Sequence, residues 1–177
     1  MFSGRMTAVL VAAGAILRDF LSAFGISVGS YTSRIGSVVD TASYSAEEIL
    51  ARSTTNALRA MTPELEDAMR CEILSAKADG DSVGGVIRCV ASGLPAGLGE
   101  PFFDTLDGEI AKAVFAVPGV KGIEFGAGFA ASAMRGSENN DSYRMADGAV
   151  RTETNNAGGI LGGMANGAEL SFAVAFK

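Results

Sequence analysis

The sequence contains no histidine among its 177 residues. This absence excludes, within the chain itself, serine–histidine and cysteine–histidine catalysis and the usual zinc sites, so no metal site is predicted. Any acid–base chemistry must therefore come from carboxylates, lysine, tyrosine, a cofactor or another chain.

Cysteine and positive charge are also scarce. The two cysteines, Cys71 and Cys89, form no CxxC motif, and we expect free thiols in a reducing compartment such as the cytoplasm. The net charge of −6 disfavours nonspecific binding to nucleic acid, although it is compatible with a local basic pocket for a phosphate group.

The chain lacks an apolar run long enough to span a membrane. The run at residues 7–17 is followed by Arg18 and Asp19 and then continues at helical spacing. This pattern predicts an amphipathic core helix and argues against both a signal peptide and a membrane span.

The remaining composition is that of a globular protein, with 48% apolar and 19% charged residues. The length suits one domain with its own core, or a piece of a larger protein, and we take residues 1–177 as a single domain.

Hydrophobic periodicity and capping residues predict helices at 4–24, 46–60, 63–78 and 104–117, with Ser3 as the first cap. Strands are predicted at 26–39, 83–95, 120–134, 149–155 and 168–177, the last two as a closing pair. This order predicts an α+β fold, with an antiparallel or mixed sheet and helices on one face.

Three segments are candidates for function, and each has two interpretations. The glycine-dense stretch TNNAGGILGG at 154–163 suits a ligand-binding turn or close backbone packing. The start of the first helix, around Arg5, suits an anion site or an ordinary cap with a solvated arginine. The polar stretch GSENND at 136–141 suits a lid or a plain surface loop.

Together these stretches resemble the chorismate synthase family. The matching blocks are SGRMTAVLVAAGAI (3–16), GLGEPFFDTLDGEIAKAVFAVPGVKGIEFGAGF (97–129), GSENND and TNNAGGILGG, in the order that the family has them. The resemblance implies conversion of 5-enolpyruvylshikimate 3-phosphate to chorismate and phosphate, a 1,4-elimination that needs reduced FMN. It also implies a cytoplasmic homo-oligomer, usually a tetramer, with a β-α-β sandwich fold in which helices are layered against antiparallel sheets.

The resemblance also implies site residues. Ser3, Asn156 and Ala157 match residues that contact FMN, and Gly4 and Arg5 match residues that face the substrate. The loop that matches a mobile segment near the active site consists of Gly136, Ser137, Glu138, Asn139, Asn140 and Asp141. No nucleic acid or membrane partner is expected.

The chain also departs from the family pattern. It matches the middle half of a family member, without the region that holds the family's histidines, and Met1 stands where an arginine is expected. Asn139 replaces a histidine that many relatives have, and the Lys-Pro-Thr run expected after Lys177 is absent. We therefore expect the isolated chain to be a weak or inactive enzyme. The alternative is a non-catalytic scaffold or assembly module of the same fold that binds no flavin.

Overall fold

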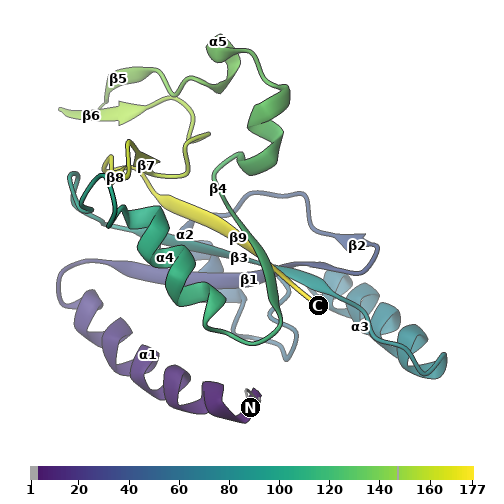
Figure 1. Ribbon diagram of the computed structural model, residues 1–177. Coiled ribbons are helices and arrows are strands. Elements are labelled where there is room, and N and C mark those ends of the chain that lie inside the picture. The colour runs from purple at the N-terminus through teal and green to yellow at the C-terminus, as the bar shows by residue number, and fades with distance from the viewer. Residues whose placement is uncertain (1–3, 147) are drawn as a thin grey trace.

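A computed structural model describes residues 4–146 and 148–177 (Figure 1). Its main sheet has the strand order β2-β1-β3-β9-β4 and is antiparallel throughout. The strands are β1 (Ser27–Ile35), β2 (Val38–Val39), β3 (Gly85–Ser92), β4 (Val120–Phe125) and β9 (Leu170–Phe176). The helices are α1 (Thr7–Ser22), α2 (Ala46–Arg52), α3 (Pro63–Ala78), α4 (Leu106–Phe115) and the short α5 (Gly136–Asn139), with 3-10 turns η1 (Gly4–Met6) and η2 (Gly128–Ala133). The α+β prediction is confirmed.

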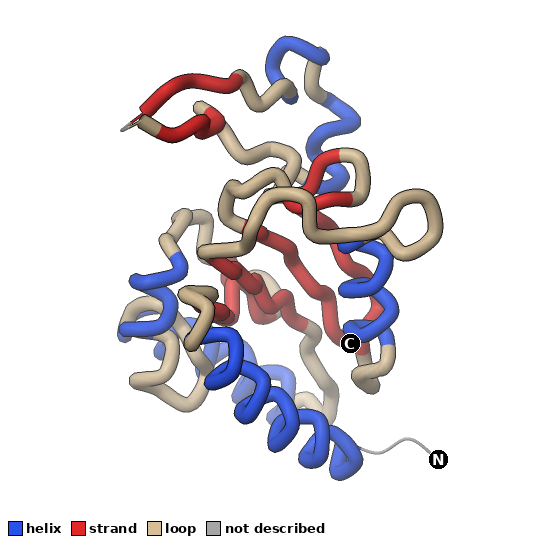
Figure 2. Tube along the Cα trace, turned by 90° about the vertical axis from the view of Figure 1, so that its left-hand side faces the viewer, coloured by secondary structure: helices blue, strands red, loops and turns tan. Residues whose placement is uncertain are grey.

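Two small hairpins lie outside the main sheet, near the upper end of the molecule in both views (Figures 1 and 2). One pairs β5 (Tyr143–Ala146) with β6 (Ala149–Thr152), and the other pairs β7 (Ile160–Leu161) with β8 (Met164–Ala165). The predicted closing pair was wrong, because β6 pairs with β5, whereas β9 lies between β3 and β4. The polar segment before β6 contains its own strand, and this near neighbour in sequence is the partner that β6 takes.

Helices pack on both faces of the main sheet, whereas the element order predicted one face. Val90 of β3 packs with Ile49 of α2 in one buried cluster. The next residue, Ala91, belongs to a second cluster against which Leu106 and Ile110 of α4 pack. Neighbouring residues of a strand point to opposite faces, so α2 and α4 cover opposite faces.

Local capping signals explain where several helices begin. Thr62 caps α3 at the Leu65 N–H and Pro63 occupies its first turn, so this helix has its predicted bounds. The helix predicted at 46–60 ends at Arg52 instead. Asn56 turns the chain there, because its side chain both donates to the Ala60 carbonyl and accepts from the Ala60 N–H.

Two other predicted elements also differ. The strand expected at 120–134 ends at Phe125, because Gly126 turns with φ of 56° and η2 follows. The helix α1 contains no buried residue, although a core helix was expected; Val9 is 70% and Ile16 is 72% exposed. Ser3, the predicted cap of this helix, lies outside the described residues.

Candidate functional site

The glycine-dense segment between β6 and β9 is required for close backbone packing. A Cβ atom added at Gly158 would lie 2.3 Å from the Gly126 nitrogen and 2.7 Å from the Ser171 carbonyl oxygen. Gly162 and Gly163 form the two-residue turn between β7 and β8, with φ of 61° and 82°. Close packing therefore requires glycine at Gly158, and turn geometry accounts for Gly162. Both reasons apply at Gly163, where an added Cβ would lie 2.5 Å from Thr105 Cγ2.

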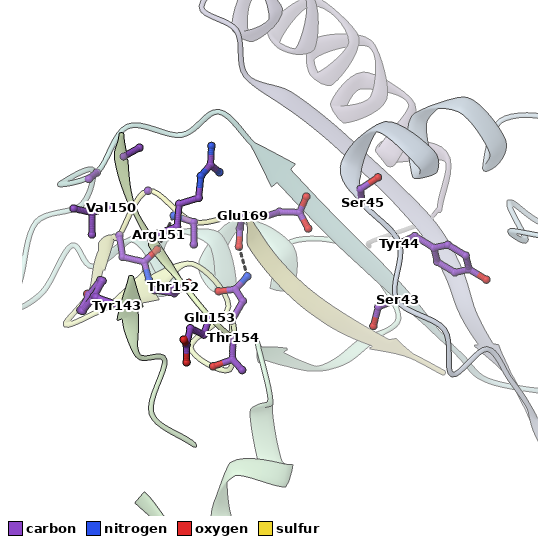
Figure 3. A pocket seen from close by; sticks show the side chains of 16 residues that line it. Ser43, Tyr44, Ser45, Tyr143, Val150, Arg151, Thr152, Glu153, Thr154 and Glu169 are labelled. Carbon is purple, nitrogen blue, oxygen red and sulfur yellow. Dashed lines mark hydrogen bonds between the residues drawn. The ribbon is translucent and has the colours of Figure 1, made fainter. Parts of the chain in front are cut away.

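Asn155 fixes the entry to this segment. Its side-chain amide donates to the Glu169 carbonyl at 2.7 Å, a contact visible in Figure 3. Its side-chain oxygen accepts from the Gly159 N–H at 2.8 Å. Both ends of the amide are thus used inside the chain, and the segment is tied to the start of β9.

The Asp141 carboxylate joins two of the predicted site segments. It accepts hydrogen bonds from the Thr154 hydroxyl at 2.6 Å, the Asn156 N–H at 2.7 Å and the Ala157 N–H at 2.8 Å. In return, the Asn156 side-chain amide donates to the carbonyl oxygens of Glu138 at 3.1 Å and Asn139 at 3.4 Å. The loop at 136–141 and the Asn156–Ala157 pair therefore form one hydrogen-bonded unit.

The environment of Asp141 favours its charged form. Partial burial raises the pKa of the carboxyl group, but the hydrogen bonds from Thr154, Ala157 and Asn156 lower it by more. The net pKa lies below the ordinary value, so the group is an acceptor at neutral pH. The rest of the loop is exposed, and its first residues form α5, where the Glu138 carboxylate accepts from the Arg135 N–H at 2.8 Å.

Two cavities flank this unit. The larger has a volume of about 830 Å³. In Figure 3 the side chains of β6 and the segment after it stand on one side, Ser43, Tyr44 and Ser45 stand on the other, and Glu169 lies between them. The smaller cavity has a volume of about 490 Å³, and Asn156 lies on its wall together with Arg88, Tyr31, Tyr44 and Ala127. Both volumes lie within the range of roughly 300–1,000 Å³ that small-molecule sites have.

Two tyrosines that sequence reasoning did not single out line these cavities. The rings of Tyr31 and Tyr44 meet edge to face with centroids 5.4 Å apart, and the Tyr44 hydroxyl donates to Asp40 at 3.3 Å. Burial raises the pKa of both phenols, and the nearby Asp40 carboxylate raises it further. Tyr31 comes from β1, and Tyr44 comes from the segment before α2.

The structure does not bring all predicted site residues together. Gly4 and Arg5 lie in η1, at the lower end of the molecule in both views, whereas α5 and the segment after β6 lie toward the upper end (Figures 1 and 2). Ser3 lies outside the described residues. Within one copy of the described chain, Arg5 is therefore remote from Asn156 and Ala157.

The donors of Asn156 and Ala157 limit what this segment can bind. Both backbone N–H groups and the Asn156 side-chain amide donate inside the chain, so they form no phosphate cradle. The Asn156 side-chain oxygen remains as an acceptor for a ligand, and an acceptor suits a ring N–H.

Neither a metal cluster nor a membrane span is present in the part of the chain that the structure describes. None of its helices combines the length and apolar character that crossing a bilayer requires. No group of three or more cysteine, aspartate or glutamate side chains among these residues is arranged to hold a metal ion.

Comparison with known proteins identifies the family. The family model described as chorismate synthase matches residues 1–177. The curated chorismate synthase of Dehalococcoides mccartyi is 47% identical over 178 residues, which are 99% of this chain and 48% of the relative. That of Korarchaeum cryptofilum is 42% identical over 176 residues, again 99% of this chain and 48% of the relative.

A solved structure is similar along the same length. A structure titled "Crystal Structure of Chorismate Synthase" superposes with a TM-score of 0.91 at 35% sequence identity, covering 99% of this chain and 56% of that one. The chain spans about half the length of the curated relatives that it matches. With a family model that matches it from end to end, this chain belongs to the chorismate synthase family.

Proposed function

We propose that this chain contributes the central part of a chorismate synthase, a lyase of aromatic biosynthesis acting in the cytoplasm. The proposed reaction is the elimination of phosphate from 5-enolpyruvylshikimate 3-phosphate to give chorismate. The observation that carries the proposal is the family match over residues 1–177. The α+β fold, an antiparallel sheet with helices packed on both faces, supports it.

The proposed chemistry is balanced without net oxidation. The carbon–oxygen bond to phosphate breaks, phosphate leaves, and a proton is lost from the ring. Reduced FMN, when bound, supplies transient electron donation to this elimination. The protein's task is to orient the substrate and to stabilise the departing phosphate.

On the basis of the resemblance, we assign roles to the chain's own residues. Arg5, with the backbone of Gly4, would bind an anionic group of the substrate, which suits a guanidinium at a helix start. Asn156 and Ala157, with Ser3, would contact the flavin ring, and Asp141 would hold the first two in place. Because the chain has no histidine, we expect the isolated chain to lack effective proton transfer, a loss of about 10²–10⁴ in rate.

A second candidate function is a scaffold or assembly module that binds no flavin. Two observations favour it: Arg5 lies remote from Asn156, and the Asn156–Ala157 donors are satisfied within the chain. In this alternative the sequence blocks that match the family would serve folding and subunit packing alone.

An anaerobic titration with FMN, with and without 5-enolpyruvylshikimate 3-phosphate, tests the proposal. We expect saturable changes in flavin absorbance and fluorescence that strengthen with substrate. Arg5→Gln should remove the strengthening by substrate, whereas Arg18→Gln, in the adjoining helix α1, should retain it. Flavin spectra that do not respond to the chain at any concentration would support the scaffold instead.

A further inference from the structure

A third cavity, separate from the candidate site, lies at the other end of β3. Its volume is about 440 Å³, and it is bounded by β1, β3, α3 and the segment that follows α2. Its lining is mostly apolar and includes Ile35, Leu58, Ile73, Ile87 and Phe176. It shares no lining residue with the two cavities beside Asn155.

Two arginines stand at this apolar cavity, and a backbone irregularity places the first. The pairing of β1 with β3 shifts register between Thr32 and Arg34. Such a bulge adds a residue to one strand and redirects the side chains that follow it. Arg34, directly after the shift, lies on the lining of the cavity with its side chain exposed.

The second arginine is held in a conformation that L-residues rarely adopt. Arg59 has φ of 54°, in the left-handed region. The surrounding turn is fixed on both sides: the Thr32 N–H donates to the Arg59 carbonyl at 3.0 Å, and the Thr32 hydroxyl donates to the Leu58 carbonyl at 2.6 Å. The two hydrogen bonds between the Asn56 side chain and the Ala60 backbone close the same turn. The strain at Arg59 is thus maintained by four hydrogen bonds.

Neither guanidinium is neutralised by the protein. Within residues 4–146 and 148–177, Arg34 and Arg59 take part in no ion pair and no side-chain hydrogen bond. The acidic side chain of α3 closest in sequence to Ile73 is Glu72, and its carboxylate accepts from the Ser37 N–H at 2.9 Å. Among the described residues, these two positive charges therefore border an apolar cavity without an acidic partner.

We propose that this cavity is a binding site for a small carboxylate with an apolar body. The carboxylate would accept hydrogen bonds from Arg34 and Arg59, a geometry that guanidinium groups favour. The apolar body would bury against Leu58, Ile87 and Phe176. This site goes beyond the proposed elimination reaction, because it involves none of the residues assigned to that reaction.

Three probes separate the contribution of the carboxylate charge from that of the apolar body. Octanoate carries both the charge and the apolar body, acetate carries only the charge, and 1-octanol carries only the body. We expect calorimetric titration of the full chain to show saturable binding of octanoate that is at least about tenfold tighter than that of either other probe. Amide NMR shifts should localise octanoate to Gly84 and Gly85, which line the cavity.

Variants of the two arginines complete the test. Arg34→Gln and Arg59→Asn should each weaken octanoate by about tenfold, and asparagine is chosen because it tolerates the left-handed region. Arg70→Gln is the matched control, since Arg70 lies on the same helix as Ile73 but pairs with Glu66. Thermal unfolding checks each variant, and Arg34→Gln alone suffices if Arg59→Asn does not fold.

Several results would overturn the proposal. One is a failure of octanoate to bind at millimolar concentration, which is the result expected if another segment or a second copy of the chain fills the cavity. Another is 1-octanol that binds as tightly as octanoate, which would make the site merely apolar. The third is an equal loss of affinity in Arg34→Gln and in the Arg70→Gln control.

Discussion

At the scale of single residues, the contact between the loop at 136–141 and the asparagine–glycine segment depends on Asp141. Its carboxylate receives one hydroxyl and two backbone donors from residues that lie 13 to 16 positions further along the chain. A charged acceptor is needed here, because two of these donors are backbone N–H groups that no change of rotamer can redirect. The role that we propose for Asn156 and Ala157 at the flavin therefore depends on Asp141.

The first prediction concerns Asp141→Asn. The amide NH₂ group of the new residue would face donors, so we expect the free energy of unfolding at pH 7 to fall by about 1–2 kcal/mol, after allowance for solvent screening. The pKa of Asp141 is lowered in the folded state, so its contribution is present above the unfolded pKa of about 4 and is lost as pH falls through the folded pKa. The difference between the two proteins should shrink accordingly in urea titrations carried from pH 7 to pH 3.

The control for this prediction is Asp67→Asn, an exposed position on α3. It should unfold like the parent chain at every pH. If the urea midpoints of Asp141→Asn stayed parallel to those of the parent down to pH 3, the carboxylate would not carry the contact.

The second prediction compares two glycines with the same backbone conformation and different surroundings. Gly158 and Gly162 have φ of 68° and 61°, but an added Cβ meets the Gly126 nitrogen at the first and open space at the second. Gly162→Ala should cost about 1–2 kcal/mol, the conformational penalty alone. Gly158→Ala should cost about 4 kcal/mol or more, because backbone must move. Equal midpoints in urea would show that the packing around Gly158 yields easily.

At the scale of elements, the parts that could be predicted from sequence are those with local signals. Thr62 followed by Pro63 marks the start of α3, and Gly80 lies just past its end, so the predicted bounds match the structure. The end of α2 could not be predicted, because the residues that follow it look like a continuation of the helix in the sequence. The chain turns there through hydrogen bonds between the Asn56 side chain and the Ala60 backbone, which the sequence pattern does not indicate.

Some contacts between segments could not be predicted either. The pairing of Tyr143 with Thr152 was missed because the segment before β6 is polar and carries no strand alternation. The meeting of Arg34 and Arg59 at one cavity depends on a register shift and a left-handed residue, and neither has a local sequence signature. The glycine-dense segment indicated that its backbone must lie without side chains close to another group, but it did not indicate which group that is.

The third prediction tests a local signal at α2. Ser45 accepts from the Glu48 N–H at 3.3 Å, and the Glu48 carboxylate accepts from the Ser45 N–H at 3.0 Å, which forms a capping box. Ser45→Ala should lower the free energy of unfolding by about 0.5–2 kcal/mol. Ser75→Ala, in the exposed interior of α3, should cause no loss, because alanine is the better helix former. Differential scanning calorimetry of both variants checks the contrast, and an unchanged Tm for Ser45→Ala would contradict it.

At the scale of the whole molecule, the described chain leaves α1 largely uncovered. This helix contacts β1, yet all of its residues except Thr7 and Leu21 fall in the exposed class. A helix that is apolar around most of its circumference is typical of a buried layer. Its small residues, from Ala12 to Ala15, would allow another layer to approach closely.

The last prediction follows from this uncovered helix. Contiguous apolar surface of this kind drives association, so we expect the chain in solution to form dimers or larger species through α1. Val9→Lys combined with Ile16→Lys places two charges on exposed apolar positions of this helix, 70% and 72% accessible, and should shift multi-angle light scattering to the monomer mass. Leu74→Lys, at an exposed apolar position of α3, is the control and should leave the assembly intact. A parent chain that scatters as a monomer at all concentrations would show that α1 is covered from within, and an assembly that survives both lysines would place the interface on another surface.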